Sequence, residues 1–244
     1  IGKFAFENCS GFDELVISSS SLNVVYERAF YNCSGFKGSL DLSNQVTDIY
    51  ESAFENCFNF DKLLLSSSLK SIQKRAFYNC YGFKGSLSIS NQVTEIGESA
   101  FEYCYGFDGE LTLSSSLKII KERTFNNCSS FKGTLSIPNQ VTEIEKLAFA
   151  YCSGFDKLIL SSSLQKVQER AFYYCSGFKG EFDFSSSFSE LFDEAFCGCS
   201  GFTGTLVLRD IKFHNAVFAN CTGITSIDFV TNKIMTKIAS IEII

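Results

Sequence analysis

The sequence predicts a repeat solenoid, a right-handed stack of coils with a parallel β-sheet on one side and short helical turns on the other. The main observation is a phrase, A-F-x-x-C-x-G-F-x-G, that recurs every 22 to 24 residues from Phe6 and Cys9 to Phe218 and Cys221. A fixed period of this length indicates coils that bury their apolar faces only against neighbouring coils. The second observation is that most of the 27 Phe residues occupy two fixed positions of this phrase, as expected for a continuous core.

About ten tandem repeats fill residues 1–227, and residues 228–244 are expected to form a degenerate terminal repeat or a tail. The chain begins partway through a repeat, so we expect it to be a segment of a longer protein. The net charge is -6 and there is no cluster of Lys or Arg, which argues against a nucleic-acid partner. No apolar run of roughly 18 residues occurs, so no membrane span is expected.

Each repeat begins with strand-forming residues. In the repeat from Lys37 to Phe60, residues 39–43 alternate polar and apolar, which predicts a short strand with its leucines pointing inward. Residues 43–45 are expected to turn the chain. A second short extended piece follows at residues 46–49, with Val and Ile inward. Stacked coils should repeat at the strand spacing of about 4.8 Å.

The second half of each repeat predicts a turn of helix. In residues 51–57 the side chains of Ala53, Phe54 and Cys57 share one helical face at i, i+1 and i+4. The Gly or Asn that follows the Cys by two positions suits a left-handed residue that ends such a helix. Phe60 then returns to the core, and the next strand begins.

The residue after the second Phe alternates between Asp and Lys along the chain. We expect these side chains to form one exposed column in which opposite charges are adjacent, which opposes slippage by one coil. The members are Asp13, Lys37, Asp61, Lys84, Asp108, Lys132, Asp156 and Lys179.

Ten of the 11 Cys residues occupy one equivalent position, one per coil. Side chains that point the same way in register do not give the approach and torsion of a disulfide, so these thiols are expected to be free and buried. Cys197 lies outside the column and is predicted to be the exposed, reactive thiol. No set of Cys residues converges as a zinc site requires, and no metal site is expected.

No catalytic residues or cofactor-binding residues can be assigned, and the chain is not expected to be an enzyme. The single His, His214, has no equivalent in the other repeats, so neither a nucleophile–His relay nor a histidine metal site is expected. Paired carboxylates such as Glu51/Glu55 and Glu98/Glu102 are interpreted as solvated surface charges.

Four asparagines lie in N-x-[ST] sequences, at Asn8, Asn32, Asn127 and Asn220. In a secretory pathway they would be glycan acceptors. The alternative is structural, because Asn precedes the Cys in repeats that lack this sequence as well, where it would satisfy backbone groups at the end of the turn.

The frame x-L-x-[LI]-S-x-x-[LV]-x-x-I-x-x-x-A-F-x-x-C-x-G resembles the BspA-like, or Treponema-type, leucine-rich repeats over residues 1–227. Two departures from that family are Ser in place of Pro after most strands, with only Pro138 kept, and the second Phe with its K/D-G insertion. The resemblance implies a cell-surface or secreted protein of a bacterium or protist that takes part in adhesion to host matrix, host cells or other microbes. It implies no enzyme activity.

Two surfaces are candidates for binding a protein partner. The first is a set of tyrosines on the turn side, although part of it could only cap the core: Tyr81, Tyr103, Tyr105, Tyr151, Tyr173 and Tyr174. The second is the outward strand face, with Asp41, Thr112 and Asp183, which lacks the aromatic residues typical of binding hot spots. The competing hypothesis is a cytoplasmic scaffold or filament protein that associates with itself.

Overall fold

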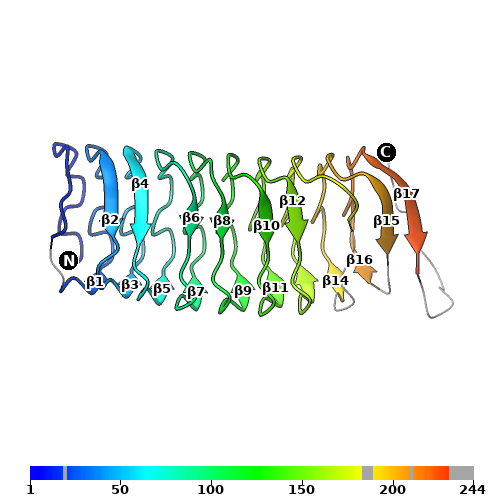
Figure 1. Cartoon of the computed structure of the whole chain (residues 1–244), viewed down its shortest axis with the longest axis horizontal. Helices are drawn as coiled ribbons and strands as arrows, with labels where there is room; N and C mark the ends of the chain where they lie inside the picture. Colours follow the sequence, from blue (N-terminus) through cyan, green and yellow to red (C-terminus); the bar gives the residue numbers. More distant parts are fainter. Residues whose placement is uncertain (19–20, 183–188, 209–210, 231–244) are drawn as a thin grey trace.

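The computed structural model describes residues 1–18, 21–182, 189–208 and 211–230. These residues form an elongated β-solenoid of about nine turns with parallel sheets, as Figure 1 shows. The repeat solenoid predicted from the sequence is thereby confirmed. Two rows of strands run along its length instead of the single sheet that was expected.

The first row consists of strands two residues long, at the position of the second extended piece of each repeat. Parallel pairing joins four of them into one sheet and five into another, and β7 and β9 are not paired with each other. Each strand except β16 places one buried aliphatic side chain in the core, as with Ile49 paired to Ile72, and β16 contributes the half-buried Phe213. The strands are β1 (Val24–Val25), β3 (Asp48–Ile49), β5 (Ser71–Ile72), β7 (Glu95–Ile96), β9 (Ile119–Ile120), β11 (Glu143–Ile144), β13 (Lys166–Val167), β14 (Glu190–Leu191) and β16 (Lys212–Phe213).

The second row consists of strands two to six residues long that pair two by two, at the position of the first predicted strand. Alternation sets their burial: Leu40 and Leu42 of β2 are buried, whereas Asp41 between them is exposed. The pairs are β2 (Gly38–Leu42) with β4 (Phe60–Leu65), β6 (Leu87–Ser88) with β8 (Leu111–Thr112), β10 (Thr134–Ser136) with β12 (Lys157–Ile159), and β15 (Gly204–Leu208) with β17 (Ile224–Phe229).

The helical turns expected on the remaining side are not confirmed, because the described residues contain no helix. Overlapping turns replace them. The amide of Glu55 donates to the Ser52 carbonyl at 3.2 Å within the coil, whereas the amide of Phe54 donates to the Ala76 carbonyl of the next coil at 2.8 Å. A helix requires every amide to bond inside its own segment, and here alternate amides join neighbouring coils instead.

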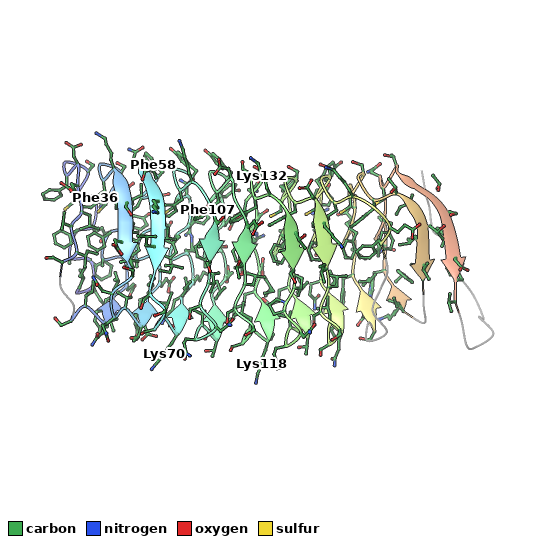
Figure 2. All side chains as sticks on the ribbon, in the orientation of Figure 1. Phe36, Phe58, Lys70, Phe107, Lys118 and Lys132 are labelled. Carbon is green, nitrogen blue, oxygen red and sulfur yellow. The ribbon has the colours of Figure 1, made fainter. Side chains whose placement is uncertain are left out.

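The interior is filled by two columns of Phe rings, and Figure 2 shows the side chains packed between the rows of strands while Lys70 and Lys118 point outward. Phe101 is fully buried, with its ring centroid 5.2 Å from that of Phe77 and 5.5 Å from that of Phe125. The Phe positions identified in the sequence are therefore core positions, except at the end coils, where Phe6 is 39% exposed and Phe218 is half-buried.

The thiols of the cysteine column join successive coils. The Cys104 thiol donates to the Phe77 carbonyl oxygen at 3.0 Å, and the Cys128 thiol donates to that of Phe101 at 3.1 Å. The same bond recurs in every coil from Cys33 to Cys221. All eleven cysteines are free. A small side chain with a weak donor, aimed at a carbonyl of the previous coil, explains why this position is Cys.

The predicted column of alternating charges is only partly formed. Lys37 and Lys179 pair with the Asp of the preceding coil at 2.9 and 2.8 Å. Asp108 instead accepts a hydrogen bond from the Gly85 amide at 2.8 Å. Because these side chains are exposed, each such pair contributes only about 0.2–1 kcal/mol.

Candidate functional site

The six tyrosines predicted as a binding surface lie on the turn side of coils four to eight, and we call them the tyrosine surface. Four of them are exposed: Tyr103 by 36%, Tyr105 by 44%, Tyr151 by 42% and Tyr174 by 43%. The other two, Tyr81 and Tyr173, are half-buried. The structure thus brings these residues to one side of the solenoid.

The tyrosine surface divides into two clusters. In the first, the rings of Phe58, Tyr81 and Tyr105 stack face to face, with centroids 5.1 and 5.2 Å apart. In the second, Tyr151 packs edge-on against Tyr173 at 5.6 Å, and Tyr173 packs edge-on against Tyr174 at 4.6 Å. The coil that carries Cys128 separates the clusters and contributes no tyrosine.

Three of the exposed tyrosines have a left-handed backbone, with φ of 63° at Tyr103, 61° at Tyr151 and 54° at Tyr174. For a residue with a large side chain this conformation costs roughly 1–2 kcal/mol, whereas Asn tolerates it. Other coils place Asn at the equivalent position, immediately before the Cys: Asn8, Asn32, Asn56, Asn79, Asn127 and Asn220, with φ between 57° and 61°. The three tyrosines therefore occupy positions that local backbone energetics would give to Asn.

The glycines two positions after the Cys have a different role from the one expected, because they do not adopt a left-handed backbone. They allow close approach instead. A Cβ on Gly106 would lie 2.0 Å from the Tyr81 carbonyl oxygen, and one on Gly154 would lie 2.3 Å from that of Phe131. Each coil instead has a left-handed residue immediately before the Cys and a second one four positions earlier, as with Ser99 and Tyr103.

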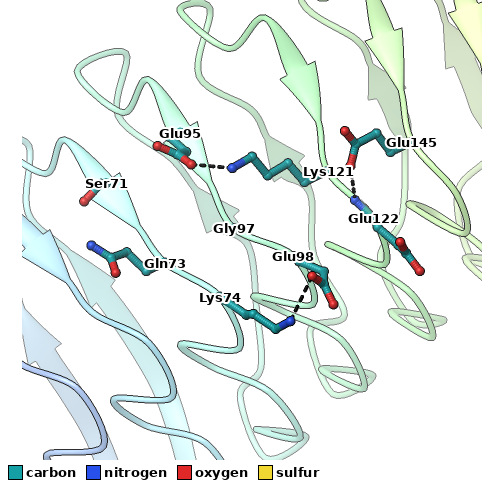
Figure 3. Close-up of a pocket in the computed structure, with 9 residues that line it drawn as sticks. All are labelled: Ser71, Gln73, Lys74, Glu95, Gly97, Glu98, Lys121, Glu122 and Glu145. Atoms are coloured by element: carbon teal, nitrogen blue, oxygen red, sulfur yellow. Dashed lines mark hydrogen bonds and ion pairs between the residues drawn. The ribbon is translucent and has the colours of Figure 1, made fainter.

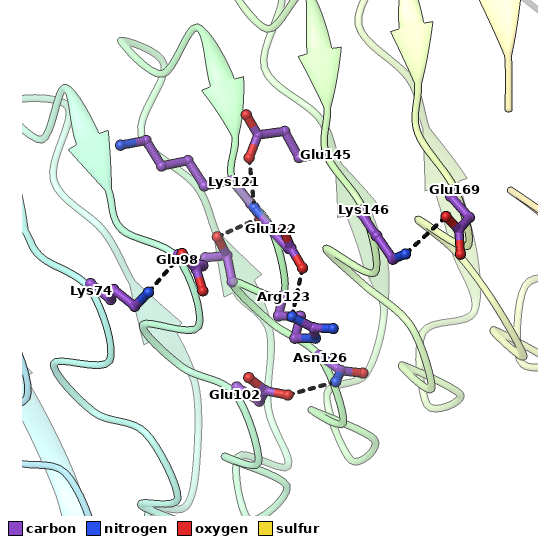
Figure 4. A network of polar contacts seen from close by, with 11 residues as sticks. Lys74, Glu98, Glu102, Lys121, Glu122, Arg123, Asn126, Glu145, Lys146 and Glu169 are labelled. Atoms are coloured by element: carbon purple, nitrogen blue, oxygen red, sulfur yellow. Dashed lines mark hydrogen bonds and ion pairs between the residues drawn. The ribbon is translucent and has the colours of Figure 1, made fainter.

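Two carboxylates beside the tyrosines are buried, which corrects the prediction that they form a solvated face. Glu55 is 3% exposed and pairs with Arg75 at 3.0 Å. Glu102 is 6% exposed and accepts a hydrogen bond from the Asn126 side chain at 2.8 Å, as seen in Figure 4. Burial, followed by the charge of Glu102, raises the pKa of Tyr103, so this phenol stays neutral near neutral pH.

A shallow depression of about 580 Å³ lies over the break between β7 and β9 (Figure 3). It is lined by Ser71, Gln73, Lys74, Glu95, Gly97, Glu98, Lys121, Glu122 and Glu145. Its two lysines are each paired with a carboxylate, Lys74 with Glu98 at 2.9 Å and Lys121 with Glu95. Sequence analysis missed this feature, although Gly97 could have indicated it, since several other coils carry a long side chain at that position.

On the strand face, Asp41 and Thr112 are exposed as predicted, and Asp183 lies outside the described residues. The Asp41 carboxylate accepts hydrogen bonds from the Ser43 amide at 2.9 Å and the Ser43 hydroxyl at 2.5 Å. These two bonds lower the pKa of Asp41, and the bond from the Ser43 hydroxyl contributes most. One carboxylate oxygen is therefore already engaged within the chain.

Cys197 is 4% exposed, which corrects the expectation of an exposed thiol. Cys197 lies two residues before the in-phase Cys199, at the position that Tyr173 and Asn126 hold in other coils. Neighbouring coils cover this position. Burial raises the pKa of Cys197, and the charge of Glu194 acts in the same direction. A buried, protonated thiol is a poor nucleophile, so the structure gives no reason for Cys197 to react first.

The four asparagines of the N-x-[ST] sequences lie at the surface, with Asn8, Asn32 and Asn220 exposed and Asn127 half-buried. The Asn32 amide donates to the Asn8 side-chain oxygen at 2.9 Å, and Asn79 donates to Asn56 in the same way. Asn56 and Asn79 lie outside any N-x-[ST] sequence, so the left-handed backbone and this amide ladder explain Asn here without a glycan.

His214 belongs to a surface contact in the last described coils. Its Nε2 lies 2.8 Å from the Glu190 carboxylate, and its ring stacks on Phe192 at 4.6 Å. Within the described ranges, no group of three or more His, Cys, Asp or Glu side chains is arranged to hold a metal ion. The same residues include no helix long and apolar enough to cross a membrane.

Comparison with known proteins gives similarity at the level of family and fold. A leucine-rich repeat protein of Bacteroides ovatus is 23% identical, with a TM-score of 0.67 over 85% of this chain and 59% of that one. A leucine rich cell surface protein of Faecalibacterium prausnitzii is 19% identical, with a TM-score of 0.54 over 93% of this chain and 76% of that one. The leucine-rich repeat protein of T. pallidum is 24% identical, with a TM-score of 0.57 over 64% and 72%.

At these identities the structures show the shared fold alone, and this chain spans 59% of the length of the B. ovatus protein. Comparison with the curated proteins found no match. The model of the BspA type leucine rich repeat region matches residues 1–132 and 118–240. Because these matches extend over nearly the whole sequence, the chain belongs to the BspA-type leucine-rich repeat family.

Proposed function

We propose that this chain is a non-catalytic binding module that acts in adhesion at a cell exterior and contacts a protein partner through the tyrosine surface. The observation that carries the proposal is the left-handed backbone of exposed Tyr103, Tyr151 and Tyr174. Side chains that are costly to the fold and remain exposed are better explained by a contact than by stability.

The chemistry of the tyrosine surface suits recognition. Tyr presents a large, rigid apolar area with a polar tip, and it is enriched at binding hot spots. The pKa of Tyr103 and that of Tyr173 are raised, with burial as the main cause, so these hydroxyls act as neutral donors and acceptors near pH 7. A rigid solenoid holds such side chains at fixed separations before a partner arrives.

Two further features support this function. Family membership favours binding over catalysis, since a repeat solenoid offers a large surface for its length. A structural relative from F. prausnitzii is described as a cell surface protein, and this supports a cell-exterior location here.

The test is binding of the purified chain to extracellular matrix proteins and to intact cells. Replacing Tyr103, Tyr105 and Tyr151 together by Ser should abolish binding while the thermal transition stays nearly unchanged. Replacing Asp41 and Thr112 on the strand face is the matched control, because both are exposed and lie far from the tyrosines.

Three outcomes would contradict the proposal. Binding that survives the Tyr changes but is lost with Asp41 and Thr112 would move the contact to the strand face. Absence of any extracellular partner, together with end-to-end assembly detected by sedimentation, would favour the scaffold function. Turnover of a bound molecule would contradict the non-catalytic role.

A further inference from the structure

The coil between the two tyrosine clusters carries neutral polar side chains in place of aromatic ones. Residues 126–130 read Asn-Asn-Cys-Ser-Ser, and we call the half-buried Asn127, Ser129 and Ser130 the polar floor, while Asn126 is buried. Tyr103 and Tyr105 stand on the coil before it, and Tyr151 stands on the coil after it. With coils about 4.8 Å apart, the floor is one coil wide between aromatic side chains roughly 10 Å apart.

Tyr105 has one ring face without an aromatic partner. It ends the stack of Phe58, Tyr81 and Tyr105, because the same position on the next coil is Ser129. The planes of Tyr81 and Tyr105 lie within 2° of parallel, so the covered face of Tyr105 is turned toward Tyr81 and the other face toward the polar floor. The 44% exposure of Tyr105, against the half-buried Tyr81, agrees with this arrangement.

Ser130, next to Ser129, also departs from the usual residue of the repeat. Eight other coils have Gly at this position, and in seven of them a Cβ would lie 2.0 to 2.3 Å from a carbonyl oxygen of the preceding coil. Real Cβ atoms do not approach so closely. Ser130 therefore adds a hydroxyl at a position where most coils have no side chain.

The polar floor can both donate and accept hydrogen bonds. The Asn127 amide donates to the Asn126 side-chain oxygen at 3.2 Å, and the Asn126 amide donates to buried Glu102 at 2.8 Å, so this chain of bonds orients both amides. In the part of the chain that the structure describes, the Asn127 side-chain oxygen and the hydroxyls of Ser129 and Ser130 make no side-chain hydrogen bond. The nearby charges are mixed in sign: Asp108 and Glu102 are negative, and Lys132 and Arg123 are positive.

We propose that the free face of Tyr105 and the polar floor bind one ring of a neutral saccharide. A pyranose has an apolar C–H face that packs on an aromatic ring, and hydroxyls at its edge that match Ser and Asn side chains. The absence of a charged side chain from the floor favours a neutral sugar over a sulfated or acidic one. This inference rests on the proposed function, since it names the chemistry that the tyrosine surface recognises on its partner.

The test uses the chain made without N-glycans, so that Asn127 is unmodified, and immobilised neutral hexasaccharides of glucose, galactose, mannose and N-acetylglucosamine. A sulfated hexasaccharide is the charged comparison. We expect saturable binding to at least one neutral sugar. Tyr105→Ser should weaken it at least about tenfold, the loss of one stacked ring contact.

Ser129→Tyr is the sharper variant, because it extends the ring stack by one member and covers the free face of Tyr105 without removing any tyrosine. It should also weaken binding about tenfold or more. Tyr26→Ser is the matched control: Tyr26 is similarly exposed at 40%, but it lies outside the tyrosine surface, with its ring 5.3 Å from that of Tyr50. The Tyr26→Ser variant should bind the sugar as the parent does.

The proposal is overturned if no neutral saccharide binds, if the sulfated one binds more tightly, or if Ser129→Tyr leaves binding unchanged. A glycoprotein partner and a free polysaccharide are distinguished by removing the glycans enzymatically from the partner. Tyr-dependent binding to the deglycosylated protein with equal affinity would overturn the saccharide site and leave the proposed function intact. If no partner of any kind binds in a way that depends on the tyrosines, both the saccharide site and the proposed function are overturned.

Discussion

The buried thiols predict that the fold loses stability steeply above about pH 9. Burial is the first cause that raises the pKa of most of them above the ordinary value of 9.0, to about 12 for Cys152 and Cys221. Six of these thiols with a raised pKa are fully buried: Cys80, Cys104, Cys128, Cys152, Cys175 and Cys199. The perturbation is simply a rise in pH from 8 to 10.

The direction follows from proton counting. Between about pH 9 and 12 the unfolded chain releases thiol protons that the folded chain keeps, so the folded state binds more protons and the free energy of unfolding falls with pH. Each thiol contributes about 1.4 kcal/mol per pH unit in this window. For Cys152, whose pKa is about 12, the loss at pH 10 is about 1.4 kcal/mol, and the other buried thiols with a raised pKa act in the same direction on a total stability of about 5–15 kcal/mol for an ordinary domain.

The assay is urea unfolding followed by circular dichroism at pH 8, 9 and 10, with the free energy of unfolding plotted against pH. Replacing Cys104, Cys128 and Cys152 by Ala should lower the stability at pH 8, because each loses a bond to a Phe carbonyl, but should also reduce the slope above pH 9 by about a third, since three of nine thiols with a raised pKa are removed. A parent chain with equal stability at pH 8 and 10 would refute the reasoning.

Three further predictions follow from the stack. Phe101→Ala should cost about 3–5 kcal/mol in urea unfolding, and Phe6→Ala clearly less, since Phe6 is 39% exposed; equal losses would contradict the ring columns. A thiol reagent at pH 8 should modify Cys197 only after denaturant is added, and native modification would contradict its burial. In hydrogen exchange, the Lys121 amide should exchange faster than that of Glu145, which donates to Ile120 at 2.8 Å, because β7 and β9 are not paired; equal protection would show a continuous sheet.

The sequence predicts the fold well because the period determines which residues share a column. Phe101 and Cys128 were assigned to the core and to the thiol column from spacing alone, and the structure places both there. The expected helical turn was wrong for a physical reason. Residues 51–57 have the right apolar spacing for a helix, but hydrogen bonds between coils take alternate amides, which a pattern within one repeat does not reveal.

Burial of single residues outside the columns was predicted less well. Glu55, Glu102 and Cys197 lie on the turn side, where coil-to-coil contact covers positions that an isolated turn would expose. The tyrosines were identified as candidates because Tyr varies between coils. The left-handed backbone of Tyr103 and the end of the ring stack at Tyr105 needed coordinates.

The most direct test of the tyrosine surface is replacement of Tyr103, Tyr151 and Tyr174 by Asn, the residue that other coils use at the same left-handed position. Relief of backbone strain, roughly 1–2 kcal/mol per site, should offset the lost ring contacts of about 0.5–1.5 kcal/mol, so the melting temperature should stay the same or rise. Affinity for the extracellular partner should fall at least about thirtyfold. An unchanged affinity in this well-folded variant would contradict the assignment of binding to the tyrosines.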